Sequence, residues 1–434
     1  MRSRRQEIGD RRKEKGDRRQ NEGGIKLIPV VLVFAFLMLP EKAGAFYEYK
    51  GDNSNFRGRL AVDLMSGFTH YPQPEIIYPE DTEGFNSATS RLLLDSTIAG
   101  DTRLDFNGYI YANSNEQTYF SNYSNQKDSP YRFPQLYWEI SQTDNSLIIG
   151  DIDQLSVKYH SARSNLTAGR QPVSLANNFL FTPNDVFYPF SATAVDREFR
   201  PGVDALRFDY DITELSTITA LGVAGYDGND PSWEKSAVIL RGSMNVKSID
   251  VSVIAGKTDN RRLAGMTLNA EAYTLGMRLE GNYSHPTEGE AHADFFQISV
   301  GIDKRWENSL HVIFEYFYHG NGKSNPDQYM ERVIDDPDIM DPYLGRNYAG
   351  ILVQGEPSPL FTLQCALLAN LDDGSILFGP GVIYSISDEA ELILGGVIPY
   401  GETSYYAAND FALDVKSEFG LYPRSVYLLG RVYF

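Results

Sequence analysis

Charged side chains of alternating sign gather in the segment from Thr167 to Tyr210. Eight of them could do chemistry, and these are Arg170, Asp185, Asp196, Arg197, Glu198, Arg200, Asp204 and Arg207. Guanidinium and carboxylate groups can pair with one another and fix a segment in place. In a pore they can also face the passage and select solutes by charge and size. Both roles stay open for this segment, and one does not exclude the other.

Covalent catalysis and metal chemistry find little support in the sequence. His160 stands beside Ser161 and near Ser164, but a hydrolase also needs an orienting group and an oxyanion site, and no residues suggest them. The six histidines are scattered without the spacing of a zinc site. Cys365, the only cysteine, is typical of a small strand residue. We therefore predict that the protein is not an enzyme and holds no metal or other cofactor.

The segment that carries the charges does not have the pattern of a strand. Alternation of apolar and polar residues stops after Gln171 and resumes at Val203, and a loop of about thirty residues is usually either functional or disordered. Its phenylalanines are too many for a disordered segment, and they are Phe179, Phe181, Phe187, Phe190 and Phe199. We expect an ordered loop that folds into the structure formed by the flanking strands.

Those strands belong to a pattern that fills the chain after residue 55. Roughly 18 to 20 segments of about 8 to 13 residues alternate between apolar and polar positions, which predicts strands with one apolar and one polar face. Examples are Leu104–Ile110, Ile249–Ile254 and Phe296–Ile302. Turn dipeptides such as Asp227-Gly228 and Asp373-Gly374 separate them. The chain is therefore predicted to be all-β.

Three features favour a transmembrane barrel over a soluble β-protein. The segments match the ~9–11 residues that a tilted strand needs to cross a bilayer. Aromatic residues cluster at segment ends, where they are expected to form interfacial girdles; these clusters are Tyr109/Tyr111, Tyr316/Phe317/Tyr318 and Tyr405/Tyr406. The last segment, Val426–Phe434, alternates and ends on an aromatic residue, as the final strands read by the bacterial barrel-assembly machinery do.

Lipid offers no partners to backbone groups, so a sheet in a membrane must close on itself. At roughly 20 to 24 residues per strand and connection, the chain after its leader gives about 16 to 20 strands, and 18 is our prediction. The predicted fold is a single antiparallel transmembrane barrel whose lumen receives the charged loop. A barrel of this size has room for such a loop or for water.

The N-terminal region is predicted to be a secretory signal. A basic stretch precedes an apolar core from Ile25 to Leu39, and Ala43-Gly44-Ala45 forms a small-x-small cleavage site. At about 15 residues, the core is shorter than the ~20 that a transmembrane helix needs. We expect residues 1–45 to be removed after Ala45 and residues 46–434 to form the barrel in the outer membrane of a Gram-negative bacterium.

The composition agrees with this assignment. The net charge of −19 disfavours binding of nucleic acid, whose phosphates need a basic footprint. Only 42% of the residues are hydrophobic, fewer than a helical membrane protein of this length would have. For a barrel in the outer membrane, the expected partners are outer-membrane lipid and lipopolysaccharide and the barrel-assembly machinery. A periplasmic cytochrome or export protein is a further candidate partner.

The charged segment resembles a known family of barrels. The residues that carry the resemblance are Gly169-Arg170-Gln171, the step from Asn184 to Phe190, and the run from Asp196 to Arg207, and the stretch Gly276-x-Arg278-x-Glu280-Gly281 is similar as well. They look like the alginate-export type of outer-membrane barrel and related porin-like proteins. The resemblance implies an 18-stranded barrel with an arginine-lined lumen narrowed by a loop, with Arg170, Arg197, Arg200 and Arg207 as lumen residues.

Two functions follow from these expectations. The first is a porin-like channel for passive diffusion or export of solutes, with charged saccharides as candidates. The second is a sheath around a multihaem cytochrome in an electron-transfer complex. The chain has no CxxCH motif of its own, so the second function needs a haem-bearing partner.

Overall fold

The computed structural model describes residues 47–72, 82–114, 129–143, 146–189, 198–259, 261–287, 293–335, 343–403, 405–407 and 412–434. The predicted signal, residues 1–45, lies outside the described residues. Within the described ranges, no helix combines the length and the apolar character needed to cross a membrane. Almost every regular element is a strand, as the alternating sequence predicts.

The strands follow one another along the chain with short connections. They are β1 (Tyr47–Lys50), β2 (Asn55–His70), β3 (Thr82–Ile98), β4 (Thr102–Asn113), β5 (Tyr137–Thr143), β6 (Ser146–His160), β7 (Ser164–Pro172), β8 (Gly202–Thr213), β9 (Ser216–Asp227), β10 (Asp230–Val246), β11 (Ile249–Lys257), β12 (Arg261–Ala272), β13 (Leu275–Pro286), β14 (Phe295–Arg305), β15 (His311–His319), β16 (Asn347–Ser358), β17 (Phe361–Asn370), β18 (Ile376–Ser387), β19 (Ala390–Tyr400), β20 (Tyr405–Ala407), β21 (Ala412–Asp414) and β22 (Arg424–Tyr433). The short helices are η2 (Pro134–Leu136), η3 (Pro326–Gln328), α3 (Tyr329–Asp335) and η4 (Phe419–Leu421).

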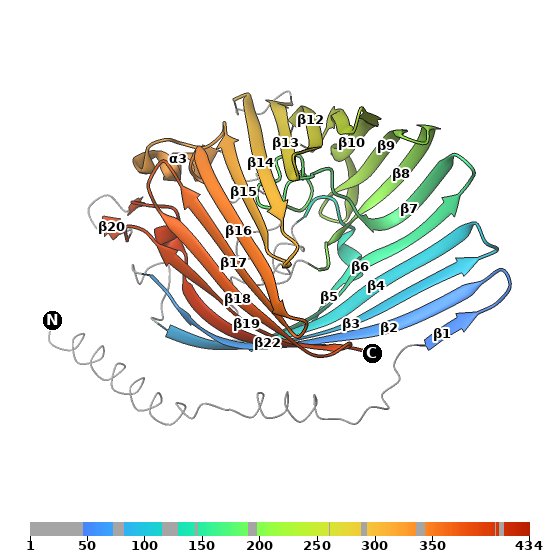
Figure 1. The fold of residues 1–434 in the computed structure, drawn as a ribbon, viewed down its shortest axis with the longest axis horizontal. Helices are drawn as coiled ribbons and strands as arrows, with labels where there is room; N and C mark the ends of the chain where they lie inside the picture. Colours follow the sequence, from blue (N-terminus) through green and yellow to red (C-terminus); the bar gives the residue numbers. More distant parts are fainter. Residues whose placement is uncertain are drawn as a thin grey trace. The chain divides into compact units, whose positions relative to one another are not determined.

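Eighteen of these strands close into one antiparallel barrel, which confirms the predicted fold and strand number (Figure 1). The ring closes where β22 pairs with both β19 and β2. Two short strands, β1 and β5, are not counted because each shares one side of a longer strand with a strand of the ring. The start of β2 pairs with β1 and the rest of that side with β22. The first half of β6 pairs with β5 and the second half of that side with β7. Closure leaves the wall with paired edges, as lipid demands.

Alternation along the strands separates an outer apolar surface from an inner surface. On β8, for example, Leu206, Phe208 and Tyr210 are exposed to the outside, whereas Val203 and Ala205 are buried inside. Large exposed apolar side chains recur on strands all round the ring, among them Ile110, Leu240, Val300, Leu363 and Val426. Such a belt on a closed barrel is the surface that lipid tails cover.

The two ends of the barrel differ in their connections. At the end where β22 finishes and β1 lies, hairpins turn in a few residues, as at Lys247-Ser248 and Tyr273-Thr274, where both residues have positive φ. That conformation suits the two-residue turn that joins twisted antiparallel strands. At the other end lie the long connections, such as residues 320–346 and 401–423. Outer-membrane barrels place short turns toward the periplasm and long loops outside.

Two sequence-based expectations need correction. Several strands are longer than the expected 9–11 residues, and β3 and β10 reach 17, because strands can continue pairing beyond the apolar belt. Tyr109 and Tyr111 do not form part of an interfacial girdle. They are each 4% exposed and pack with Ile149 inside the barrel, since both lie at inward positions of β4. Phe317 is also internal, at 2% exposure.

Candidate functional site

The barrel interior holds an ordered loop, as the sequence predicts. Strand β7 ends at Pro172, which lies opposite Gly202 at the start of β8. Between them, the described residues 173–189 and 198–201 contact interior side chains of β3, β12, β13, β14, β15 and β22. Figure 1 shows this part of the chain, drawn in green, running inside the curved wall.

One glutamate of the wall binds the loop by its main chain. Glu280, on β13, is fully buried. Its Oε2 accepts hydrogen bonds from the backbone N–H groups of Asn177 (2.7 Å) and Asn178 (3.0 Å), and its Oε1 accepts one from Asn184 (2.8 Å). The carboxylate thus fixes both sides of a turn in the loop.

A second glutamate repeats the arrangement two strands away. Glu315, on β15, is also fully buried and accepts from the backbone N–H groups of Phe179 (2.7 Å), Leu180 (3.0 Å) and Phe181 (2.9 Å). Phe181 then stacks on Phe317 at a centroid distance of 5.2 Å. A hydrogen bond within a protein contributes about 0.5–1.5 kcal/mol, and each of these side chains makes three, so they are the main anchors of the loop on this wall.

Sequence reasoning missed both anchors. It considered a holding role only for the charged residues between Thr167 and Tyr210, because charge alternation was visible there. Glu280 and Glu315 are single acidic residues at inward positions of strands, and nothing local distinguishes them from lumen residues in contact with water. Inward parity was the signal that both share, Glu280 also stood in a stretch similar to the porin-like barrels, and the backbone donors that they bind have no side-chain signature.

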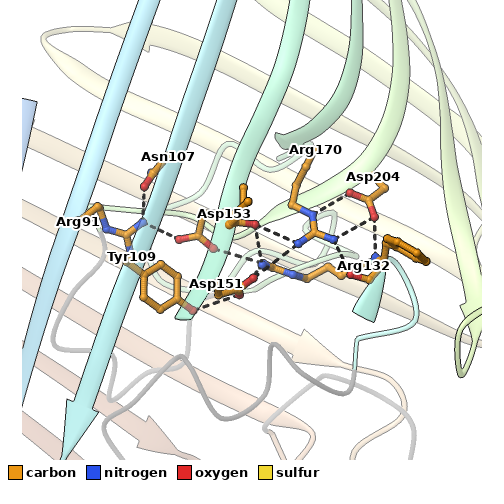
Figure 2. A network of polar contacts seen from close by, with 10 residues as sticks. Arg91, Asn107, Tyr109, Arg132, Asp151, Asp153, Arg170 and Asp204 are labelled. Atoms are coloured by element: carbon orange, nitrogen blue, oxygen red, sulfur yellow. Dashed lines mark hydrogen bonds and ion pairs between the residues drawn. The ribbon is translucent and has the colours of Figure 1, made fainter. Parts of the chain in front are cut away.

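A second set of contacts joins the opposite wall in one polar network (Figure 2). Arg91 of β3 binds Asp153 (2.6 Å), and Arg132 binds both Asp153 (3.3 Å) and Asp151 (2.6 Å). Asp151 and Asp153 lie on β6. Arg170 of β7 extends this series of ion pairs, because it lies 3.6 Å from Asp151 and 2.8 Å from Asp204 of β8. Three guanidinium groups and three carboxylates therefore form an electrically neutral ladder across five segments.

The network also satisfies backbone groups that the strand pattern leaves open. Strand β6 pairs with β5 up to Asp151 and with β7 from Leu155 onward, so the intervening residues lack a strand partner on that side. The carbonyl of Ile152 accepts from Arg170 (3.0 Å) and Arg132 (3.2 Å) instead. Burial lowers the pKa of Arg132, but Asp151 and Asp153 more than offset this, so its pKa lies above the ordinary value. Arg132 therefore stays charged in its buried position.

The sequence-predicted residues divide into three groups. Arg170 and Asp204 pair with each other, and Arg170 is only 2% exposed, so the pair holds β7, β8 and residue 133 together. Asp185 is buried and pairs with Arg200 within the loop. Burial raises the pKa of Asp185 to about 6 although Arg200 opposes the shift. All four residues are therefore paired with one another and hold their segments together, as the first of the two expected roles requires.

Two further candidates keep some exposure. Glu198 pairs with Arg431 of β22 at 2.9 Å, which ties the end of the loop to the strand that closes the ring. Arg207 lies at an inward position of β8, pairs with Asp209, and keeps 37% of its side chain exposed. Asp196 and Arg197 lie outside the described residues. A direct role of any of these side chains in selecting solutes stays a prediction.

The loop also presents a group of side chains toward the open interior. The ring of Phe179 is 40% exposed and lies 4.3 Å from the guanidinium of Arg278, on β13. Arg278 pairs with Asp303 of β14, which also contacts His311 of β15 at 3.0 Å. An aromatic face over a paired cation offers a solute both an apolar and a polar surface.

A third internal cluster lies toward the long-loop end of the barrel. Glu418, just before η4, is 1% exposed, and its Oε2 accepts from the Tyr348 hydroxyl and from Asn370 (2.8 Å). Asn370 also donates to Asp373 (3.1 Å), so two carboxylates share one amide. Burial raises the pKa of Glu418 to about 7, although the Tyr348 hydroxyl lowers it. Phe419 extends from here into the apolar interior.

Among the residues with a described structure, no group of three or more His, Cys, Asp or Glu side chains is arranged so that it could hold a metal ion. The interior therefore offers three kinds of surface: glutamate anchors for the loop, a neutral arginine–aspartate ladder, and the exposed group around Phe179. This arrangement can narrow and shape a passage.

Comparison with known proteins supports the porin-like fold. No protein-family model and no curated protein sequence matches the chain. The chain is similar in structure to a BenF-like porin from Pseudomonas fluorescens Pf-5, with a TM-score of 0.55 at 9% identity, over 87% of this chain and 98% of that one. It is also similar to Pseudomonas aeruginosa OpdL, with a TM-score of 0.53 at 11% identity and the same coverages.

At such identities the likeness shows the fold alone. The porin-like part of the sequence resemblance is confirmed at that level, since the cited neighbours are barrels of this architecture. The alginate-export part of the resemblance stays a prediction.

Proposed function

We propose that the protein is a porin-like channel of a bacterial outer membrane, through which solutes pass by passive diffusion. The observation that carries the proposal is a closed 18-stranded barrel with an apolar outer belt and an internal loop anchored to its wall. A ring of eighteen strands encloses more space than its own side chains fill. A loop folded inward then sets how much of that space remains open.

The interior supports selection by shape and polarity more than by strong net charge. The ladder of Figure 2 is neutral, and Arg278 and Arg207 each have an aspartate partner. Charged saccharides, including alginate-like polymers, remain candidate solutes from the sequence resemblance. The candidate function as a cytochrome sheath has no observation of its own in the structure, and the internal loop would compete with such a partner for the lumen.

The test is conductance in a planar bilayer. Purified barrel should give stepwise ion currents, and sugars of increasing size should be excluded in liposome-swelling assays at a definite cut-off. Folded barrels that insert but carry no current would contradict the proposal. Co-purification of a haem protein that blocks the current would favour the sheath function instead.

A further inference from the structure

A cavity of about 270 Å³ lies beside the arginine–aspartate ladder, at the inner face of β5. Trp138 and Ile140 of this strand are exposed on the outer face of the barrel, so Tyr137 and Glu139 point inward. Tyr137 also packs on the internal cluster around Tyr109. The wall of the cavity includes Tyr137, Glu139, Arg132, Phe133, Asp151 and Arg170. The cavity therefore belongs to the lumen wall and not to the surface that faces lipid.

One carboxylate oxygen in this wall has no hydrogen-bond donor among the described residues. Asp151 is 2% exposed, and its Oδ2 accepts from Arg132 (2.6 Å) and from the Tyr109 hydroxyl (3.2 Å). Its Oδ1 accepts no hydrogen bond, because the nearest nitrogen of Arg170 is 3.6 Å away. Buried polar atoms nearly always have a partner, so this oxygen needs a donor that the wall itself does not supply.

The arginines around the cavity already donate to the protein itself, as Figure 2 shows. All three nitrogens of Arg170 are donors: Nε and Nη2 bind Asp204, and Nη1 binds the carbonyl of Ile152 at 3.0 Å. Both terminal nitrogens of Arg132 donate to the two aspartates of β6. The cavity thus offers an acceptor in place of a donor. A ligand that completes this wall must itself donate a hydrogen bond.

The charges at the cavity favour a ligand without charge. The ladder has three arginines and three aspartates, and Glu139 adds a fourth carboxylate at the cavity, so the whole group carries one net negative charge. An acidic ligand would add a second unpaired negative charge, and burying an unpaired charge is costly. A cationic ligand would lie against the guanidinium groups of Arg132 and Arg170, which line the same cavity. A neutral donor avoids both penalties.

We propose that this cavity is a subsite for one ring of an uncharged sugar. One sugar hydroxyl donates to Oδ1 of Asp151, and the C–H face of the ring lies on Tyr137 and Phe133. Contact with Tyr226, at a centroid distance of 5.5 Å, supports the ring of Phe133. Ligand sites combine aromatic walls with a few placed polar groups, and sites for drug-sized ligands measure ~300–1,000 Å³, so this smaller cavity suits a single ring. The proposal rests on the proposed channel function, because the sugar reaches the cavity through the lumen.

The test is saturation-transfer NMR on the purified barrel in detergent micelles. The neutral probes are the methyl glycosides of glucose, galactose and mannose, and the charged probes are methyl glucuronide and protonated methyl glucosaminide. At least one neutral glycoside should bind, and both charged probes should bind roughly tenfold more weakly or less, because each adds an unpaired charge. Among monodeoxy forms of the bound glycoside, loss of one particular hydroxyl should weaken binding by a similar factor, because Oδ1 of Asp151 then loses its donor.

Two variants of β5 place the binding at this cavity without touching the ladder. Y137A removes a ring from the cavity wall and should weaken the neutral glycoside strongly. The matched control is W138A, which removes a larger ring from the outer face of the same strand and should leave binding unchanged. E139Q removes the excess negative charge, so the glucuronide should then bind more nearly as the neutral glycoside does. The compact band in unheated SDS gels shows that each variant is folded.

Three results would overturn the subsite. They are no binding of any neutral glycoside, equal losses in Y137A and W138A, and a glucuronide that binds the unmodified barrel as well as the neutral sugar does. The NMR measurement needs no ion current. A barrel that binds the sugar but does not conduct would contradict the channel function alone, and a barrel that conducts without binding it would contradict the subsite alone.

Discussion

The two glutamate anchors show how few side chains hold the internal loop. Each accepts three backbone N–H groups from a segment that has no helix or strand of its own. A buried donor that loses its acceptor costs about 1–3 kcal/mol, so each anchor controls several such groups at once. Loop position should therefore respond to these residues more than to any side chain of the loop.

The substitution E315Q tests this claim. A glutamine offers one acceptor oxygen in place of two and turns an amide toward the N–H groups of residues 179–181, so the loop should loosen there. We expect noisier single-channel currents with a larger mean conductance. The same substitution at the exposed Glu356 should leave the currents unchanged. Equal effects of the two substitutions would show that the anchor does not set the passage.

Glu418 predicts a dependence on pH at the long-loop end. Its pKa is raised from 4.5 to about 7 by burial, so the folded state binds a proton that the unfolded loop has already released between these values. The contribution to stability, roughly 3 kcal/mol from the size of the shift, is full below about pH 4.5. It falls as the pH rises and is lost above about pH 7.

Hydrogen exchange of residues 415–422 measures this effect. Exchange corrected for its intrinsic pH dependence should accelerate from pH 5 to pH 8, since an ionised Glu418 lies beside the carboxylate of Asp373, and Tyr329 and Tyr348 are the other titratable neighbours. In E418Q the corrected exchange should be flat with pH. An unchanged slope in that variant would assign the dependence to another group.

At the scale of elements, the loop between β7 and β8 can be removed without breaking the wall. Pro172 and Gly202 are register partners, so a short glycine-rich hairpin turn can join them in place of residues 173–201. We expect a large rise in conductance and in the size of sugars admitted, because the segment anchored on Glu280 and Glu315 is gone. Inserting the same turn sequence at Asp227-Gly228 is the control and should change neither.

Sequence reasoning reached the elements more reliably than their contacts. Period-two alternation located strands such as β4, β11 and β14, since a wall between lipid and interior imposes that pattern on every strand. The loop start after Gln171 and the strand start near Val203 were also correct. The predicted side of some aromatic residues was wrong, as at Tyr109, because an outward girdle position and an inward position differ by one residue along the strand. The unpaired stretch of β6 around Ile152 could not be predicted either, since it depends on which strand pairs with β6 along its length.

At the scale of the whole molecule, closure of the ring depends on the last strand. Strand β22 pairs with β19 on one side and β2 on the other. Deleting residues 424–434 would leave two long edges with unpaired backbone groups, each costly in lipid. We expect the full chain to migrate as a compact species in unheated SDS gels and the shortened chain to lose it. Retention of that species by the shortened chain would contradict closure through β22.

The two glutamates accept hydrogen bonds from the main chain of the loop and not from its side chains. Every residue type except proline offers the same N–H group, so the loop can change its residues during evolution and still dock at the same place. Among homologues, the solute range could then diversify through substitutions at exposed loop positions such as Phe179, while the two acidic positions in the wall stay fixed. The hydrogen bonds would then join a loop whose residues vary to two wall glutamates that do not.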